Sequence, residues 1–585
     1  MLPRLSLCLL LLGLPAPARA ADPVVPAPLT ETPGQYEARI KWWREAKFGL
    51  FIHWGPSSVN GTEISWSRKG HPFDHPGMET VPPEVYDNLY RKFNPTKFDA
   101  DAWMQMAKGA GMKYVVLIAK HHDGFSMWPT KLRPDYSMSA TPFKRDIVGE
   151  IADAAHKHGL KLGLYYSTRD WTHPDYLKDG NAKYNDFYHG QIRELLTNYG
   201  RVDMLWFDHV AGNWGDYRFR ELYDIIYGLQ PGIMVNDRAA RFIRGTADKP
   251  TPEIARLVRG DFDTPEQRIG VFQPDRAWES CVTMTECKDG GGWSYRPDGR
   301  TRGFEECIRM LVSCAVGDGN LLFNVGPLPT GEIEPQQVKT LGQVGRWMAK
   351  YGQSIYSTRG GPLPSGRWGG LTCRGDTIWV HVFDWPGETL RLSPIKQKVT
   401  SWKVLTGGEV KVVQTDRGLD IALPRDQQDK VDTVIELQLD APVTEIIRNA
   451  AIRSMFEDPA CGTLVSAAAT FKASSTSVHD RPATHARLFS GDRVPEGYAF
   501  HTADELNPWI IIDLGKTVSV CGVRIENRPA ERRTDGLILS ISEDGQTWTQ
   551  TWKAPQWEQT WEVPVTQLQA GAPVPGRPAR YLKLE

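Results

Sequence analysis

Residues 47–55 read Lys-Phe-Gly-Leu-Phe-Ile-His-Trp-Gly, an apolar run that ends in a histidine and a tryptophan. Apolar runs bounded by polar or turn residues recur along the chain, at residues 49–53, 114–119, 161–166, 203–207, 233–236, 278–282 and 320–325. Strands that are buried on both faces have this near-continuous apolar character. The runs therefore predict a parallel β-sheet.

Segments with helical periodicity separate these runs, at residues 100–110, 146–158, 186–199, 219–229, 304–316 and 335–351. Alternation of strands and helices over this length predicts an α/β domain with a (β/α)8-type barrel, spanning residues 21–355. Only seven runs are clear, so we expect the eighth strand within the irregular stretch 239–276. A doubly wound open sheet is the alternative, although the sequence lacks the glycine-rich phosphate turn of such folds.

The pattern changes after residue 355. Alternating apolar and polar residues, as in 377–383 and 433–439, predict a small antiparallel β-sandwich over residues 356–445. A helical stretch near 447–455 leads into a third, all-β region at 446–585. Its strands are expected at residues 471–475, 509–515, 520–528, 537–543, 548–552 and 580–585.

Composition narrows the functional class. The 69 Lys and Arg residues balance 70 Asp and Glu residues, so the chain lacks the basic excess of a nucleic-acid binder. No apolar run reaches the roughly 20 residues that a membrane-spanning helix needs. The chain has 21 Trp residues, which suit stacking against sugar rings as well as packing within β-domains. A soluble protein with a carbohydrate partner fits this composition.

The first 20 residues resemble a signal peptide. Arg4 precedes an apolar stretch at 5–14, and Ala18-Arg19-Ala20 forms a small-residue cleavage site. We therefore expect export to the periplasm or the extracellular space. Cys8 lies in this segment, and the other seven of the eight cysteines show neither an even count nor CxxC spacing, so neither a disulfide framework nor a structural zinc site is expected.

Polar residues follow the predicted strands where each strand ends. They are His53, His121, His122, Asp123, Tyr165, Tyr166, Asp208, His209 and Glu279. Because barrel enzymes gather their catalytic groups at the carboxyl ends of the strands, we expect an active site here.

Two kinds of chemistry fit these residue types. His121, His122, Asp123, Asp208 and His209 are metal-ligand types, but neighbours on a strand face opposite ways and no HExxH spacing occurs, so no metal or other cofactor is expected. Paired carboxylates instead suit glycoside hydrolysis. Asp208 is the expected nucleophile. Glu279 is the favoured acid, with Glu266 and Glu286 left open.

Five ordered motifs, at residues 47–55, 119–125, 163–167, 205–208 and 319–327, resemble glycoside hydrolase family 29, the α-L-fucosidases. The resemblance covers residues 34–352. It implies exo-acting, retaining hydrolysis of terminal α-L-fucosides through a covalent fucosyl-enzyme on Asp208. Alternatives are a secreted fucose-binding protein with an inactive barrel, or the same mechanism on another L-sugar such as an α-L-galactoside.

The resemblance also implies substrate contacts from His53, Trp66, His121, His122 and, within the Tyr-Tyr-Ser motif, Tyr166. Residues 278–295 resemble the Trp-Glu…Trp-Gly-Tyr stretch of the family, which favours Glu279 and adds Trp293. Arg268 is a weaker substrate contact. His209 stands where many members have glycine.

The last region resembles discoidin-like, coagulation factor type C domains through residues 509–515, 523–528 and 542–548. That group includes carbohydrate-binding modules. The resemblance therefore implies a β-sandwich at 446–585 and a glycan as its candidate partner.

Overall fold

The computed structural model divides the chain into two compact units, residues 1–451 and 452–585. The residues that it describes are 30–71, 78, 80–241, 243, 249–366, 368–386, 388–447, 469–476, 485, 488–489, 502, 507–526, 536–554, 560–569 and 572–585. The expected signal peptide and nearly all of the helical stretch at 447–455 lie outside them. None of the described helices is both long enough and apolar enough to span a bilayer.

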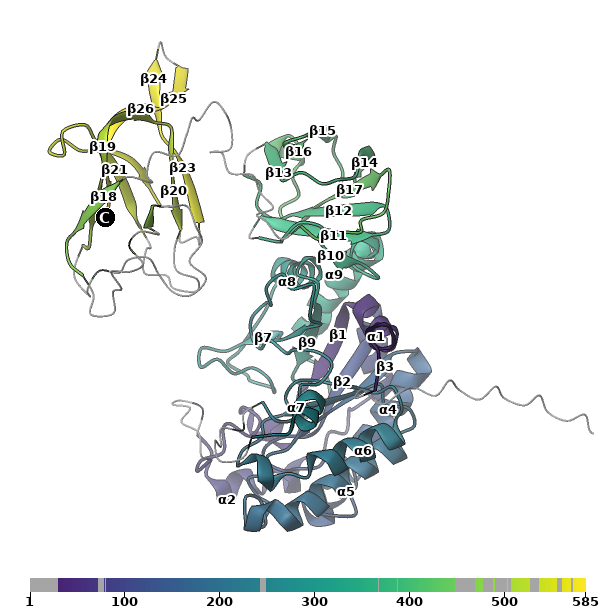
Figure 1. Cartoon of the computed structure of the whole chain (residues 1–585). Helices are drawn as coiled ribbons and strands as arrows, with labels where there is room; N and C mark the ends of the chain where they lie inside the picture. The colour runs from purple at the N-terminus through teal and green to yellow at the C-terminus, as the bar shows by residue number, and fades with distance from the viewer. Residues whose placement is uncertain are drawn as a thin grey trace, which may run out of the picture. The chain divides into compact units, whose positions relative to one another are not determined.

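A parallel sheet forms the centre of the first unit (Figure 1). Its seven strands occur in the order β5-β4-β3-β2-β1-β9-β6. They are β1 (Phe48–Ile52), β2 (Tyr114–Lys120), β3 (Lys161–Ser167), β4 (Met204–Asp208), β5 (Met234–Val235), β6 (Glu279–Thr283) and β9 (Asn320–Val325). All seven predicted runs are therefore strands.

The expected eighth strand corresponds to the segment 261–267, which lies between β5 and β6. Asp261 donates its backbone N–H to Val235 (2.7 Å), and Asp263 accepts the N–H of Glu279 (2.9 Å). Parallel bridges join the segment to both neighbours, and these pairings close the barrel. Gly260 introduces the segment at φ +62°, and a Cβ there would lie 2.1 Å from a backbone oxygen.

Strand residues alternate between the barrel interior and the surrounding helices. Phe51, Tyr165 and Trp206 belong to the interior cluster, whereas Tyr166 and Phe207 pack with the outer core. This period of two is the ordinary consequence of strand geometry. It places Tyr165 inside the barrel and the adjacent Tyr166 outside it.

Helices cover the outside of the barrel. The predicted helices correspond to α3 (Ala100–Gly109), α4 (Ile147–His158), α5 (Ala182–Asn198), α6 (Phe219–Leu229), α8 (Phe304–Val316) and α9 (Pro335–Tyr351). The sequence patterns missed α1 (Pro33–Ala46), α2 (Pro83–Tyr86) and α7 (Pro252–Val258). α1 starts with a capping box at Thr32, and its Ile40 and Trp43 pack with the interior cluster at the amino end of the barrel.

An antiparallel sandwich follows the barrel and packs against α8. One sheet has the order β10-β11-β12-β17-β14 and the other β13-β16-β15. Their bounds are β10 (Arg359–Gly360), β11 (Gly369–Arg374), β12 (Thr377–Val382), β13 (Thr389–Leu392), β14 (Val399–Val404), β15 (Lys411–Thr415), β16 (Gly418–Ala422) and β17 (Thr433–Leu439). A two-stranded ribbon, β7 (Thr285–Glu286) with β8 (Arg300–Thr301), projects from the barrel.

The second unit is all-β. One sheet has the order β18-β19-β26-β21-β22, and β20-β23 and β24-β25 form two ribbons. The bounds are β18 (Thr470–Ala473), β19 (Ile510–Val520), β20 (Gly522–Glu526), β21 (Ile538–Ser542), β22 (Thr549–Lys553), β23 (Thr560–Pro564), β24 (Thr566–Gln569), β25 (Ala572–Pro575) and β26 (Arg577–Leu584). Leu539, Ile541 and Trp561 are buried in its own core, which supports a separate domain.

Candidate active site

A cavity of about 300 Å³ opens at the carboxyl ends of the barrel strands. This volume is at the low end of ligand pockets. Among the residues that line it are His53 after β1, His121 after β2, Asp208 at the end of β4 and Glu266 from the segment 261–267. Five of the nine expected strand-end residues thus line one cavity, namely His53, His121, Tyr165, Asp208 and His209, and its aromatic walls come from Phe51, Trp66, Tyr165, Trp206 and Trp293.

Asp208 is buried in the wall of this cavity. Its Oδ1 accepts from Arg238 (3.0 Å), and its Oδ2 accepts from the Tyr165 hydroxyl (2.9 Å). Burial alone would raise the pKa of Asp208, but the neighbouring His209, the charge of Arg238 and these hydrogen bonds hold it below its usual range. The carboxylate is therefore ionised and fixed in orientation, as a nucleophile requires.

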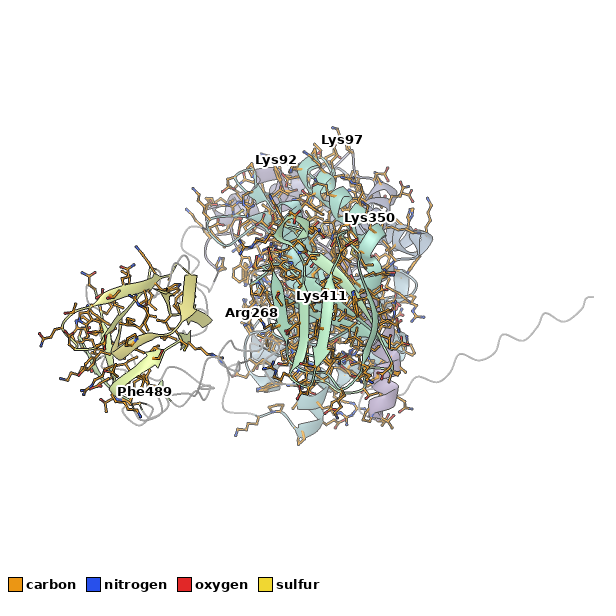
Figure 2. All side chains as sticks on the ribbon, turned by 90° about the horizontal axis from the view of Figure 1, so that it is seen from above. Lys92, Lys97, Arg268, Lys350, Lys411 and Phe489 are labelled. Atoms are coloured by element: carbon orange, nitrogen blue, oxygen red, sulfur yellow. The ribbon has the colours of Figure 1, made fainter. Side chains whose placement is uncertain are left out.

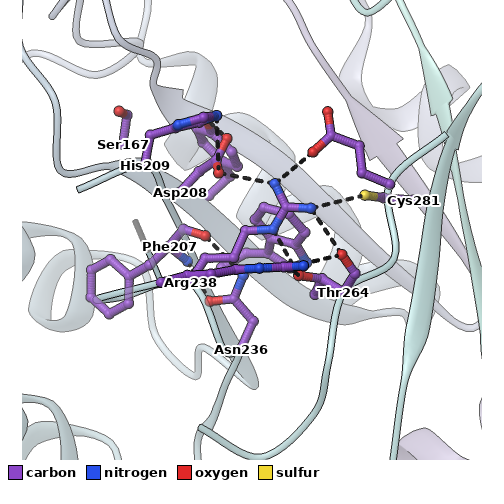
Figure 3. Close-up of polar contacts among 12 residues, drawn as sticks. Ser167, Phe207, Asp208, His209, Asn236, Arg238, Thr264 and Cys281 are labelled. Carbon is purple, nitrogen blue, oxygen red and sulfur yellow. Dashed lines mark hydrogen bonds and ion pairs between the residues drawn. The ribbon is translucent and has the colours of Figure 1, made fainter. Parts of the chain in front are cut away.

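Arg238 joins Asp208 to a second carboxylate, Glu266. Its Nη1 lies 3.0 Å from Asp208 and 2.8 Å from Glu266, while its Nε and Nη2 bind Thr264. Figure 3 shows the guanidinium among Asp208, Thr264 and Cys281. Both carboxylates bind the same nitrogen of Arg238. The separation between the two bound oxygens therefore cannot exceed the sum of the two hydrogen-bond lengths. Retaining glycosidases need a spacing of roughly 5–5.5 Å.

His121 and His122 lie together despite their adjacency. β2 ends at Lys120, so strict strand alternation stops before the two rings, whose centroids are 3.9 Å apart. His121 lines the cavity, and His122 Nε2 lies 4.0 Å from Asp208 Oδ2. His121 and His122 can therefore face the same site, because both lie beyond the end of the strand, where neighbouring side chains need not point in opposite directions.

Tyr165, rather than Tyr166, faces the nucleophile. Tyr166 points to the outer side of the barrel, where its hydroxyl donates to Gln191 (2.8 Å) and its ring stacks on Tyr188. Strand alternation fixes this choice, because adjacent side chains on β3 face opposite ways. The substrate contact expected of Tyr166 is therefore wrong, and Tyr165 is the tyrosine of the pair that lines the cavity.

Glu279 does not reach the cavity. It begins β6, so it lies at the amino end of the barrel, fully buried, and accepts from Trp43 (3.1 Å), Trp206 (3.3 Å) and the hydroxyl of Tyr114. Burial raises the pKa of Glu279 to about 7. A carboxyl group enclosed at the opposite end cannot protonate a leaving group in the cavity, so the acid role expected of Glu279 is corrected.

Two other expected residues also lie outside the cavity lining. Glu286 is exposed on β7 and pairs with Arg300 and Arg302; the hydrogen bond from Arg300 lowers its pKa. Arg268 is exposed at the surface of the first unit (Figure 2). Of Glu266, Glu279 and Glu286, Glu266 is therefore the carboxylate that lines the cavity together with Asp208.

Trp66 and Trp293 form parts of the rim. The Trp66 ring lies 5.1 Å from His122, and the Trp293 ring lies 4.7 Å from His53. Glu63 accepts the backbone N–H groups of residues 292 (2.5 Å) and 294 (3.1 Å), and this anchors the loop that carries Trp293. Burial raises the pKa of Glu63.

A metal ion could meet three donors in this cavity. His122, Asp208 and His209 offer ligand atoms within 4.8 Å of one another. His209 adopts φ +46°, a left-handed conformation that is costly for a side chain other than glycine, and its Nε2 lies 3.8 Å from Asp208. A cation here would face the Arg238 guanidinium, which already neutralises Asp208.

Arg238 and Glu63 were missed from sequence, and Tyr165 was named at its strand end but not chosen over Tyr166. Arg238 follows β5 by three residues, so the strand-end criterion that selected the other residues would also have found it. Tyr165 was half of an ambiguous pair. Nothing in the sequence marks Glu63 as part of the site, because it lies in a loop well beyond the end of β1 and belongs to no motif.

The chain matches two family models. A model described as alpha-L-fucosidase matches residues 26–353, and one described as a NedA-like, galactose-binding domain matches residues 490–580. Human tissue alpha-L-fucosidase is 29% identical over 456 residues, which cover 72% of this chain and 93% of the relative. Alpha-L-fucosidase of Branchiostoma floridae is 30% identical over 371 residues, 59% of this chain and 79% of the relative.

Solved structures agree with these matches. Alpha-L-fucosidase isoenzyme 1 from Paenibacillus thiaminolyticus superposes with a TM-score of 0.60 at 35% identity, over 69% of this chain and 99% of that chain. A GH29 alpha-L-fucosidase from Bacteroides thetaiotaomicron, trapped as a covalent intermediate in complex with 2-fluoro-fucosyl fluoride, superposes with a TM-score of 0.58 at 28% identity, over 69% of this chain and 96% of that chain.

Proposed function

The chain belongs to the alpha-L-fucosidase family, glycoside hydrolase family 29, and is an exo-acting, retaining α-L-fucosidase; we propose that Asp208 is its nucleophile and Glu266 its general acid and base. The observation that carries this assignment is the bridging guanidinium of Arg238, which holds both carboxylates at the cavity within hydrogen-bond distance of one nitrogen.

In the first step, an Asp208 oxygen attacks the anomeric carbon of the fucosyl ring, and the glycosidic C–O bond breaks. The departing oxygen takes a proton from Glu266, so a neutral alcohol leaves and an ester bond joins fucose to Asp208. Arg238 and Tyr165 support this step because they keep Asp208 ionised and aimed before the attack.

In the second step, Glu266, now a carboxylate, removes a proton from water. The resulting hydroxide attacks the anomeric carbon, the ester bond to Asp208 breaks, and fucose leaves with its original anomeric configuration. Glu266 is the more exposed partner: its side chain is 42% exposed against 10% for Asp208. That exposure suits a group that must meet both the leaving group and the incoming water.

His53, Trp66, His121, His122 and Trp293 are proposed to contact the sugar. The small cavity and its closed aromatic walls suit one terminal sugar ring, as exo-acting hydrolysis requires. A pocket with buried polar groups rejects a sugar that leaves them unpaired.

Azide rescue tests the two assignments separately. Asp208→Gly is expected to lose hydrolysis of an aryl α-L-fucoside and to regain it with azide, giving the β-fucosyl azide of inverted configuration. Glu266→Gly is expected to give the α-fucosyl azide, because azide would attack the ester on the intact Asp208. The same azide anomer from both variants would contradict the division of roles.

We extend the proposal to the other parts of the chain. Residues 1–20 serve as a signal peptide for export, residues 21–355 form the catalytic barrel, residues 356–445 form a scaffold sandwich and residues 446–585 form a glycan-binding domain. Amino-terminal sequencing of secreted protein should begin at Ala21. Glycan-array binding by the full chain carrying Asp208→Gly should persist when free fucose fills the barrel site.

A further inference from the structure

Three histidines, His53 and His121 in the cavity lining and His122 beside Asp208, each have one ring nitrogen bound to a neighbouring side chain. Each of these contacts is 2.6 Å long, and they join His53 Nδ1 to Asn324 Oδ1, His121 Nδ1 to Ser65 Oγ and His122 Nδ1 to Ser167 Oγ. The opposite nitrogen, Nε2, is left for the cavity. His122 Nε2 is buried and has no hydrogen-bond partner among the described residues.

All three rings are neutral at ordinary pH. Burial lowers the pKa of His53 to about 3 and holds the pKa values of His121 and His122 well below their usual range. A neutral imidazole carries one N–H and one lone pair. The partner of Nδ1 therefore decides whether Nε2 donates or accepts.

Asn324 makes His53 a hydrogen-bond acceptor. The Asn324 Nδ2 donates to the backbone oxygen of Trp293 (2.7 Å), which fixes the orientation of the amide. Its Oδ1 therefore faces His53 and must receive a proton from Nδ1. The lone pair of His53 is then on Nε2, directed to the sugar.

Ser65 makes His121 a donor. The Ser65 Oγ accepts the backbone N–H of Asp123 (2.9 Å), and the described residues offer its hydroxyl hydrogen no acceptor other than His121 Nδ1. Tyr86 fixes this arrangement, because its hydroxyl accepts the Ser65 N–H (2.6 Å) and donates to Asp123 (2.7 Å). Ser65 itself adopts φ +59°, a strained conformation that such a network must maintain.

Ser167 repeats this arrangement for His122. Its Oγ accepts the backbone N–H of Arg169 (3.1 Å), and its hydrogen points to His122 Nδ1. His122 Nε2 therefore carries a hydrogen, 4.0 Å from Asp208 Oδ2.

We propose that Asn324, Ser65 and Ser167 are positioning residues that set the cavity histidines as one acceptor, His53, and two donors, His121 and His122. The inference rests on the proposed function for its substrate. The sugar must place one hydroxyl so that it donates to His53, and it must offer hydroxyl oxygens to the other two rings. Specificity then depends on hydrogen-bond direction as well as on shape.

Long-range ¹H–¹⁵N correlation on the ligand-free, histidine-labelled full chain tests the protonation pattern without any substrate. The expected result is Nδ1–H for His53 and Nε2–H for His121 and His122, each assigned with its single variant. Nε2–H at His53, or Nδ1–H at the other two, would overturn the proposal even if hydrolysis occurs. Absent hydrolysis would instead count against the proposed function.

A pair of serine variants tests the device at His121. Ser65→Ala removes the hydroxyl, and the ¹⁵N signal of His121 Nδ1 should move towards that of a free imine nitrogen. Ser57→Ala is the matched control, because the Ser57 hydroxyl is buried and has no partner among the described residues. Equal spectra for the two variants would contradict the role of Ser65.

A second pair tests the consequence for the substrate. Asn324→Ala and Asn324→Asp both lose the bond to the Trp293 carbonyl, but only the first loses the acceptor for His53. An orphaned buried N–H is rarely tolerated, so His53 should become Nε2–H in Asn324→Ala and stay Nδ1–H in Asn324→Asp.

Fucose with hydrogen or fluorine in place of the hydroxyl at position 3 or 4, tested as a competitive inhibitor, measures the direction of each bond. Fluorine cannot donate, so at the position read by His53 the two replacements should raise Ki by the same factor, roughly threefold to tenfold. In Asn324→Ala, where His53 Nε2–H can only donate, fluorine should cost less than hydrogen, whereas Asn324→Asp should keep the two costs equal. The same ratio of the two costs in both variants would overturn the proposal.

Discussion

Replacement of Arg238 tests the electrostatic core of the site. Arg238→Met keeps much of the volume that packs over Trp206 but removes the charge that binds Asp208 and Glu266. The remaining burial then favours the neutral acid, so the pKa of Asp208 should rise. A hydrogen bond to a charged group contributes about 1.5–3 kcal/mol, which corresponds to about one to two pH units.

The assay is the pH dependence of kcat/KM for an aryl α-L-fucoside. The acid limb, which reports the ionised nucleophile of the free enzyme, should move up by about one to two units. Arg241→Met is the matched control: Arg241 also binds Thr264, at 3.2 Å, but forms its ion pair with Asp237, at 3.4 Å. An unmoved acid limb in Arg238→Met, with a uniform loss of rate, would refute this reasoning.

Further predictions concern the two ends of the barrel. Tyr165→Phe should lower kcat/KM about tenfold or more by removing a bond to Asp208, whereas Tyr166→Phe should leave kinetics unchanged and cost about 1 kcal/mol of unfolding free energy. Glu266→Ala should lower kcat/KM for fucosyl disaccharides about 10²-fold or more but spare kcat/KM for dinitrophenyl fucoside, whose first step needs little protonation; equal losses of kcat/KM would contradict its acid role. Because the folded pKa of Glu279 is raised to about 7, the unfolded state releases its proton first, so wild-type stability should fall between about pH 4.5 and 7, by at most about 3 kcal/mol. Urea unfolding of Glu279→Gln should lack that slope.

The barrel was predictable because its strands are marked by continuous apolar runs. Every run that the sequence marked is a strand, and the eighth position was expected within the right stretch. α1 was missed because its apolar face is interrupted by charged residues such as Arg39 and Arg44. Arg39 pairs with Asp261, far along the chain, and Arg44 pairs with Glu37 on the same helix. Local periodicity cannot reveal such ion pairs.

The site was predictable only as far as strand ends could be read. Asp208 and His121 follow clear strands, so their placement was secure. The prediction placed Glu279 at the carboxyl end of its strand. Glu279 is instead the first residue of β6 and lies at the amino end of the barrel. Glu266 lies on a segment that makes isolated bridges instead of a regular strand, and no periodicity marks such a segment.

The packing of α1 against the amino end of the barrel has a consequence for how the barrel folds. Arg39 binds Asp261, 222 residues later, and Trp43 binds Glu279, 236 residues later. These contacts have high sequence separation, and folding slows as such contacts come to dominate. Because α1 leaves the ribosome before these partners, it can dock only after the segment 261–279 has emerged, so its docking is a late event that completes the barrel.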